Sequence, residues 1–156
     1  MLASVASTYS DLVTAVFSST IAAKAWLASA AGVLALVQVS TGARIFGKVR
    51  RFVPIPPPHV NRIHRWSGRL AILLTLPVAF HCIFILGFQT SDARVLAHSI
   101  VGSLVYGVIA VKLFFVHDPD HPRVTLPVVG STLFATLAVL WSTSSLWYFT
   151  QVRFGF

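Results

Sequence analysis

Four apolar stretches, each long enough to cross a lipid bilayer as a helix, constrain this chain more than any other feature. A spanning helix needs about 20 mostly apolar residues. Such stretches lie at about 22–40, 66–88, 95–116 and 126–149, and they fill most of the 156 residues. We therefore predict an all-α, integral membrane four-helix bundle that forms a single domain over residues 1–156.

The composition excludes the other classes of protein. Hydrophobic residues make up 56% of the chain and charged residues 10%, whereas soluble domains carry about 25% charged residues. So few charges cannot cover a water-exposed surface, and so many apolar side chains exclude a disordered chain. The single cysteine, Cys82, excludes a disulfide scaffold.

Two segments lie outside the predicted spans. Residues 41–65 hold four closely spaced prolines and cannot form a continuous helix, so we expect a proline-rich loop there. Near the N-terminus, apolar residues recur at helical spacing: Leu2, Val5, Tyr9, Leu12, Val13 and Val16. This pattern predicts a short interfacial helix, and a frayed terminus is the alternative.

The excess of basic residues predicts an orientation. There are 12 Lys and Arg against 4 Asp, a net charge of +8. In a membrane protein this excess marks cytoplasmic loops and not a nucleic-acid partner. Most of it follows the first span, at Arg44, Lys48, Arg50, Arg51, Arg62 and Arg65. We therefore expect the proline-rich loop in the cytoplasm and both termini outside, in a bacterial inner (plasma) membrane.

Histidines carry the functional prediction, because an ionisable group within a span is costly unless it has a role. His81 and His98 lie near the outer ends of spans two and three, and His64 and His117 lie near the cytoplasmic ends. The separations within each helix are 17 and 19 residues, or roughly 25 and 28 Å. This pattern predicts two paired-histidine metal sites, one near each membrane face.

Haem iron fits such pairs better than zinc does. Zinc sites use three or four protein ligands, whereas two imidazoles complete the coordination of a haem and suit it to electron transfer. The chain has no C-x-x-C-H motif, so we predict one or two non-covalent b haems. Glycines one turn after two of the histidines, Gly68 and Gly102, would leave room for a porphyrin; helix packing is the alternative role.

Several assignments remain open on sequence grounds. His59 and His121, read as loop residues, could replace His64 or His117, and His117 could be only an interfacial side chain. Basic residues near the span ends could pair with haem propionates or snorkel to the interface: Arg65, Arg69, Arg94 and Lys112. A quinone is a further candidate partner, with Gln38, Arg44 and Tyr106 as possible polar contacts.

The segment HRWSGRLAILLTLPVAFH resembles the haem-bearing helix of the ferric-reductase-like transmembrane domain. More broadly, the chain is similar to small four-helix cytochromes of the b561 type. The resemblance implies electron transfer across the membrane through b haems, with His64 and His81 as the two ligands on one helix. The chain departs from ferric reductases in its wider histidine spacing and in having no Gly-rich dinucleotide fingerprint.

These observations predict a membrane cytochrome subunit that carries electrons across or within the bilayer and works beside a partner protein subunit in membrane lipid. It would be an electron-transfer part of an oxidoreductase and not a self-sufficient enzyme. Two alternatives remain: a haem-free structural or anchor subunit of a larger complex, and a small transporter that uses histidines as proton relays.

Overall fold

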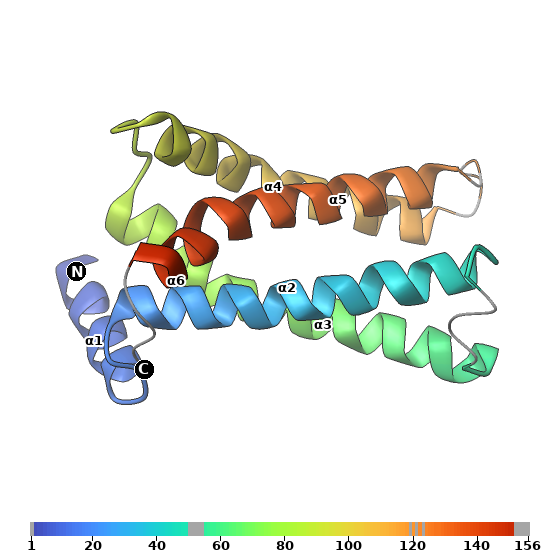
Figure 1. Ribbon diagram of the computed structural model, residues 1–156, viewed down its shortest axis with the longest axis horizontal. Coiled ribbons are helices and arrows are strands. Elements are labelled where there is room, and N and C mark those ends of the chain that lie inside the picture. Colours follow the sequence, from blue (N-terminus) through green and yellow to red (C-terminus); the bar gives the residue numbers. More distant parts are fainter. Residues whose placement is uncertain (1, 50–54, 119, 121, 123, 152–156) are drawn as a thin grey trace.

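The described part of the protein is an all-α bundle. The structure is a computed structural model that describes residues 2–49, 55–118, 120, 122 and 124–151, and it has no strand among them (Figure 1). Four helical stretches are long and apolar enough to cross a membrane, which confirms the predicted multi-pass four-helix architecture. The elements are α1 (Leu2–Thr14), α2 (Thr20–Ile45), α3 (Pro57–Phe80), η1 (His81–Leu86), α4 (Ala93–His117), α5 (Thr125–Trp141), η2 (Ser142–Leu146) and α6 (Trp147–Gln151).

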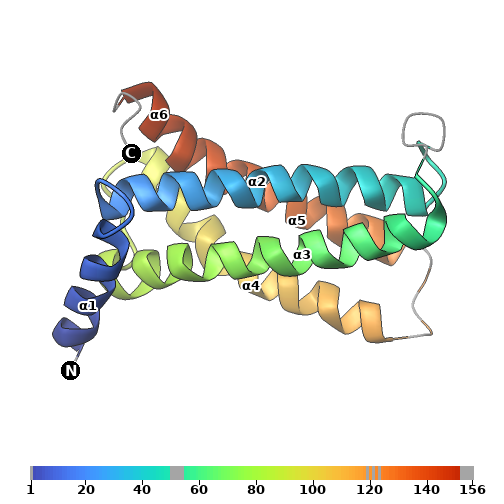
Figure 2. The same cartoon turned by 90° about the horizontal axis from the view of Figure 1, so that it is seen from below.

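The bundle consists of two helix pairs. Helix α2 packs along α3 and α4 packs along α5, while α2 also contacts α5 and joins the pairs (Figures 1 and 2). Although α3 and α4 follow each other in the chain, they scarcely touch. Helices α1 and α6 lie at the same end of the bundle (Figure 1), which we call the α1 end.

Small residues bring α2 close to its neighbours. Its buried positions are almost all alanines, among them Ala22, Ala31 and Ala35, and small side chains let helix backbones approach closely in a membrane. Large apolar side chains such as Leu73 and Leu104 are 59% and 60% exposed. Such surfaces suit a molecule whose solvent is lipid.

Two helices extend further than the predicted spans. Helix α2 continues to Ile45, and α3 already begins at Pro57. The prolines explain this start, because proline lacks an N–H that the first helical turn does not use. His59, which the sequence predicted to lie in a loop, is instead an exposed residue of the first turn of α3. His121 lies outside the described residues.

The last turns of the second span are widened. Pro77 lies inside α3, and a π-helical segment, η1, follows from His81. Wide turns of this kind often occur at functional sites. Gly87, with a φ of 68°, then ends the helix. The Ser99 hydroxyl closes the hairpin by bonding both backbone groups of Gln89.

Candidate functional site

A cavity of about 440 Å³ lies among the four long helices in the half of the bundle nearest the α1 end. It separates α4, which carries His98 and His117, from the continuous helix formed by α3 and η1, which carries His64 and His81. Its walls are mostly apolar, with residues such as Cys82, Val105 and Leu137. Its polar lining includes Lys24, Arg94, His98, Thr143 and Ser145. An apolar cavity with a few convergent polar groups is the usual form of a small-molecule site.

His98 faces this cavity from α4 with one ring nitrogen already engaged. Its Nδ1 lies 2.9 Å from the Thr143 hydroxyl of η2. That hydroxyl has one proton, which it donates to the carbonyl of Val139 at 2.7 Å. The Nδ1 of His98 is therefore the donor, and its Nε2 carries the lone pair. A hydrogen bond to the other ring nitrogen is the usual support of a metal-binding histidine.

His64 has the same arrangement at the opposite end. Its Nδ1 lies 2.8 Å from the Thr41 hydroxyl of α2, which donates to the carbonyl of Val37 at 2.6 Å. His64 is thus also held with a proton on Nδ1 and a lone pair on Nε2. The ionisable side chain in electrostatic range of His64 is Lys112 of α4. No hydrogen bond or ring contact with His117 is recorded for it in the described part of the chain.

His81, the predicted partner of His98, lies at the start of η1. It is 5% exposed, and its Nδ1 is buried without a hydrogen-bond partner. The Tyr9 ring of α1 covers it, with ring centroids 5.6 Å apart, and the Tyr9 hydroxyl donates to the Pro77 carbonyl at 3.2 Å. The next residue, Cys82, lines the cavity, whereas His81 lies on the α1 side of that wall. His81 is therefore packed between η1 and α1 and does not face the cavity.

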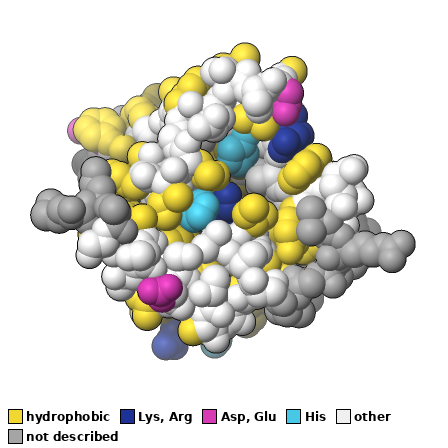
Figure 3. All heavy atoms as spheres, turned by 90° about the vertical axis from the view of Figure 1, so that its left-hand side faces the viewer, with side chains coloured by type: hydrophobic (Ala, Val, Ile, Leu, Met, Phe, Trp, Pro, Cys, Tyr) yellow, Lys and Arg dark blue, Asp and Glu magenta, His cyan; other side chains and the backbone are white. Residues whose placement is uncertain are grey.

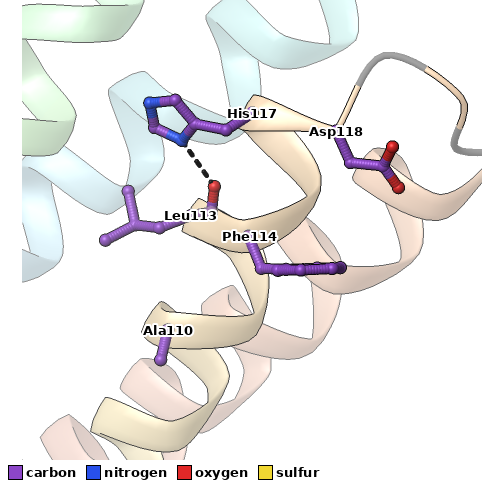
Figure 4. Close-up of a pocket in the computed structure, with 5 residues that line it drawn as sticks. All are labelled: Ala110, Leu113, Phe114, His117 and Asp118. Carbon is purple, nitrogen blue, oxygen red and sulfur yellow. Dashed lines mark hydrogen bonds between the residues drawn. The ribbon is translucent and has the colours of Figure 1, made fainter.

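His117 differs from the other three candidates. It is exposed, and its Nδ1 donates to the Leu113 carbonyl at 2.8 Å. Figure 4 shows His117, Leu113 and Ala110 along one side of α4, with Phe114 and Asp118 on the other side. These residues border a shallow surface groove, which encloses a ligand far less than the cavity at the α1 end does.

Basic side chains gather with the histidines at the α1 end. Lys24 is in electrostatic range of both His81 and His98, and Arg94 is in range of His98. Viewed from the α1 end, two histidines and neighbouring basic side chains lie in a hollow rimmed by hydrophobic residues (Figure 3). His81 and His98 therefore share a neighbouring cation, Lys24.

The remaining predicted residues have varied surroundings. Gly102 lines the cavity, and a Cβ there would lie 3.6 Å from Leu140. A Cβ on Gly68 would lie 3.2 Å from the Gln38 amide. That amide donates to the His64 carbonyl and the Ser67 hydroxyl, so Gln38 fills the space beside Gly68. Arg65 is exposed, and the guanidinium of Arg69 stacks over Trp66.

Sequence reasoning missed Lys24 and Thr143 as parts of the site. Lys24 lies one turn inside the first span, where a single cation was a usable signal. No signal marked Thr143, because its role depends on where α5 crosses α4. Within the described residues, no three His, Cys, Asp or Glu side chains come together to hold a metal ion.

Comparisons with known proteins identify the family. A family model described as "Family of unknown function (DUF6529)" matches residues 3–156. Because the match covers nearly the whole chain, the protein belongs to this family. No curated protein and no solved structure matches the chain.

Proposed function

We propose that this member of the DUF6529 family is a membrane b-type cytochrome subunit with one haem at the α1 end. The observation that carries the proposal is His98, which borders an apolar cavity between α3 and α4 while the Thr143 hydroxyl fixes its Nδ1. The free Nε2 lone pair is the form of imidazole that binds iron. Two helices that carry histidines and stand apart around a cavity suit a flat ligand between them.

His98 fits the group, because it borders the cavity, and would hold the iron from α4. His81 would hold it as well once the η1 turn, which places the His81 ring behind the cavity wall, relaxes. When bound, haem supplies reversible one-electron chemistry, and two imidazoles leave its iron no open position for a substrate. The protein's own part is to hold the imidazoles, to exclude water with apolar walls and to set the surrounding charge.

The opposite end fits a second haem less well. Gln38 fills the space beside Gly68, and His117 is exposed on a shallow groove. Lys112 of α4 is in electrostatic range of His64, where a second haem would have to fit. We therefore propose one haem, and the second haem on His64 and His117 stays a prediction.

The basic residues support an orientation for this electron path. Arg44, Lys48 and Arg62 belong to the end opposite α1, and cytoplasmic loops carry such an excess. We propose that this end faces the cytoplasm of a bacterial inner membrane and that the haem lies near the outer face. Electrons would pass between a quinol or a partner subunit and an acceptor at that face.

A reduced-minus-oxidised spectrum with a haem-to-protein ratio tests the proposal directly. The protein purified from membranes should show a Soret band, a split or sharp α band on reduction, and a haem-to-protein ratio near one. A chain that folds and carries no haem after reconstitution would contradict the proposal, and would favour a haem-free anchor subunit instead.

Thr143→Val tests the role of the hydroxyl behind His98. The change removes the acceptor of the Nδ1 proton at nearly constant volume, so the imidazole loses its fixed tautomer and orientation. We expect haem affinity to fall by about 10- to 100-fold in a titration of apo-protein with haem. Thr136→Val, on the same membrane span but outside the cavity lining, should leave the affinity unchanged. Equal affinities for both variants would remove Thr143 from the site.

A further inference from the structure

Lys24 is an unusual residue in the cavity wall. It lies on α2, one turn inside the first span, and it is half-buried. No hydrogen bond or ion pair is recorded for its ammonium group among the described residues. Asp92, at the start of α4, pairs with Arg94 at 3.8 Å. A cation that faces an apolar cavity without a counter-ion is costly unless a ligand supplies the negative charge.

Ser145 is a second, independent polar group without a partner at the same end of the cavity. Its side chain is fully buried, its hydroxyl has no partner within the described structure, and it lines the same cavity. Buried hydroxyl groups nearly always have a hydrogen-bond partner. Ser145 lies in η2, whose widened turn also carries Thr143. The unpartnered Ser145 hydroxyl is therefore only two residues from Thr143, whose hydroxyl is hydrogen-bonded to His98.

Arg94 adds positive charge at this mouth but is held by other contacts. It donates to the Thr143 carbonyl at 2.6 Å, and its guanidinium stacks over Trp147 at 4.4 Å. The other half of the cavity is largely apolar, with Val105 and Leu137 in its wall. The hydroxyls of Thr75, Ser103 and Tyr106, which also line it, are already hydrogen-bonded to one another or to the helix backbone. The cavity is therefore polarised, with cations and a free hydroxyl at the α1 end and hydrocarbon deeper in the bundle.

We propose that the cavity binds an amphiphilic carboxylate, with the ligand's carboxylate at the α1 end on Lys24 and Ser145 and its apolar body deeper in the bundle. This inference rests on the proposed function in naming the ligand: for haem, the carboxylates are the propionates, and Lys24 orients the macrocycle. A fatty acid presents the same chemistry, a carboxylate on an apolar body. Lys24 is thus a positioning residue and not an iron ligand.

The test compares ligands with and without free carboxylates. Apo-protein in nanodiscs is titrated with haem b and with haem dimethyl ester, whose propionates are esterified, and binding is followed by the Soret shift. A charge-assisted hydrogen bond contributes about 1.5–3 kcal/mol, so we expect wild type to bind haem about 10- to 150-fold more tightly than the ester. This comparison needs no variant.

Variants then assign the preference to Lys24. Lys24→Met should weaken haem binding by about tenfold or more and leave ester binding unchanged, whereas Lys24→Arg should keep most of the preference. Lys48→Met, an exposed cation at the opposite end, is the matched control and should behave as wild type. Equal binding of haem and ester by wild type would overturn the inference while leaving the cytochrome proposal intact.

A parallel titration with palmitate distinguishes haem from a fatty acid as the bound carboxylate. If no porphyrin binds but palmitate binds to wild type and not to Lys24→Met, the carboxylate site stands and the haem proposal fails. If neither haem, ester nor palmitate binds, both proposals are overturned. If haem and palmitate compete for binding to wild type, the two ligands share one site, as expected when both place a carboxylate on Lys24.

Discussion

His98→Ala is expected to abolish the Soret band of the purified protein. The change removes the one candidate ligand that both borders the cavity and has its Nδ1 fixed by a neighbouring hydroxyl. A haem left with a single protein ligand loses much of its binding free energy and its low-spin spectrum. The measurement is the haem-to-protein ratio together with the reduced-minus-oxidised spectrum.

His117→Ala is the control for this variant. His117 lies on the same helix and also has its Nδ1 bonded, but to its own helix at an exposed position. Its removal should leave the Soret band and the haem ratio at their wild-type values. A variant with His98→Ala that folds and retains a full, unshifted Soret band would contradict the proposed ligation.

The His81 ring lies behind the cavity wall and under Tyr9, so it reaches the cavity less directly than His98 does. Pro77 and the widened turn η1 determine this position. A π-helical turn can relax to an α-helical one by small changes in the backbone, which rotate the residues that follow. His81→Ala should therefore also lose haem, with Tyr9 remaining packed against Phe80.

The pattern of apolar stretches was enough to predict the bundle, because hydropathy over about 20 residues depends on the solvent and not on neighbouring helices. Helix ends were less predictable. Pro57 begins α3 about nine residues before the predicted span, since proline is tolerated in a first turn as well as in a loop. Hydropathy reports how deep a residue lies in the membrane, whereas capping decides where a helix begins.

The site was predictable in its residue types and not in its contacts. The spacing of His81 and His98 placed them at one depth, which needs only the rise per residue. The helix to which a side chain turns depends on the crossing of the packed helices. The hydroxyls Thr41 and Thr143 support histidines from other helices, and nothing in their sequence neighbours signals this. Gln38 similarly occupies the space beside Gly68.

Gly102→Leu is expected to weaken haem binding while preserving the fold. Gly102 lines the cavity one turn after His98, and a Cβ there would lie 3.6 Å from Leu140, an ordinary packing distance. Alanine should therefore be tolerated, but the rest of a leucine side chain must occupy the space that a ligand would use. Overpacking costs about 1–3 kcal/mol, so haem affinity should fall by roughly five- to 150-fold.

Gly107→Leu is the matched control on the same helix. A Cβ on Gly107 would meet no atom within 4 Å, and the residue is exposed, so the added side chain should enter lipid and leave haem affinity unchanged. Both variants add the same side chain to α4 and improve its intrinsic helix propensity equally, so a difference between them reports the cavity alone. Equal haem affinity for the two leucine variants, with circular dichroism showing both folded, would exclude this cavity as the haem site and separate its location from the identity of the ligands.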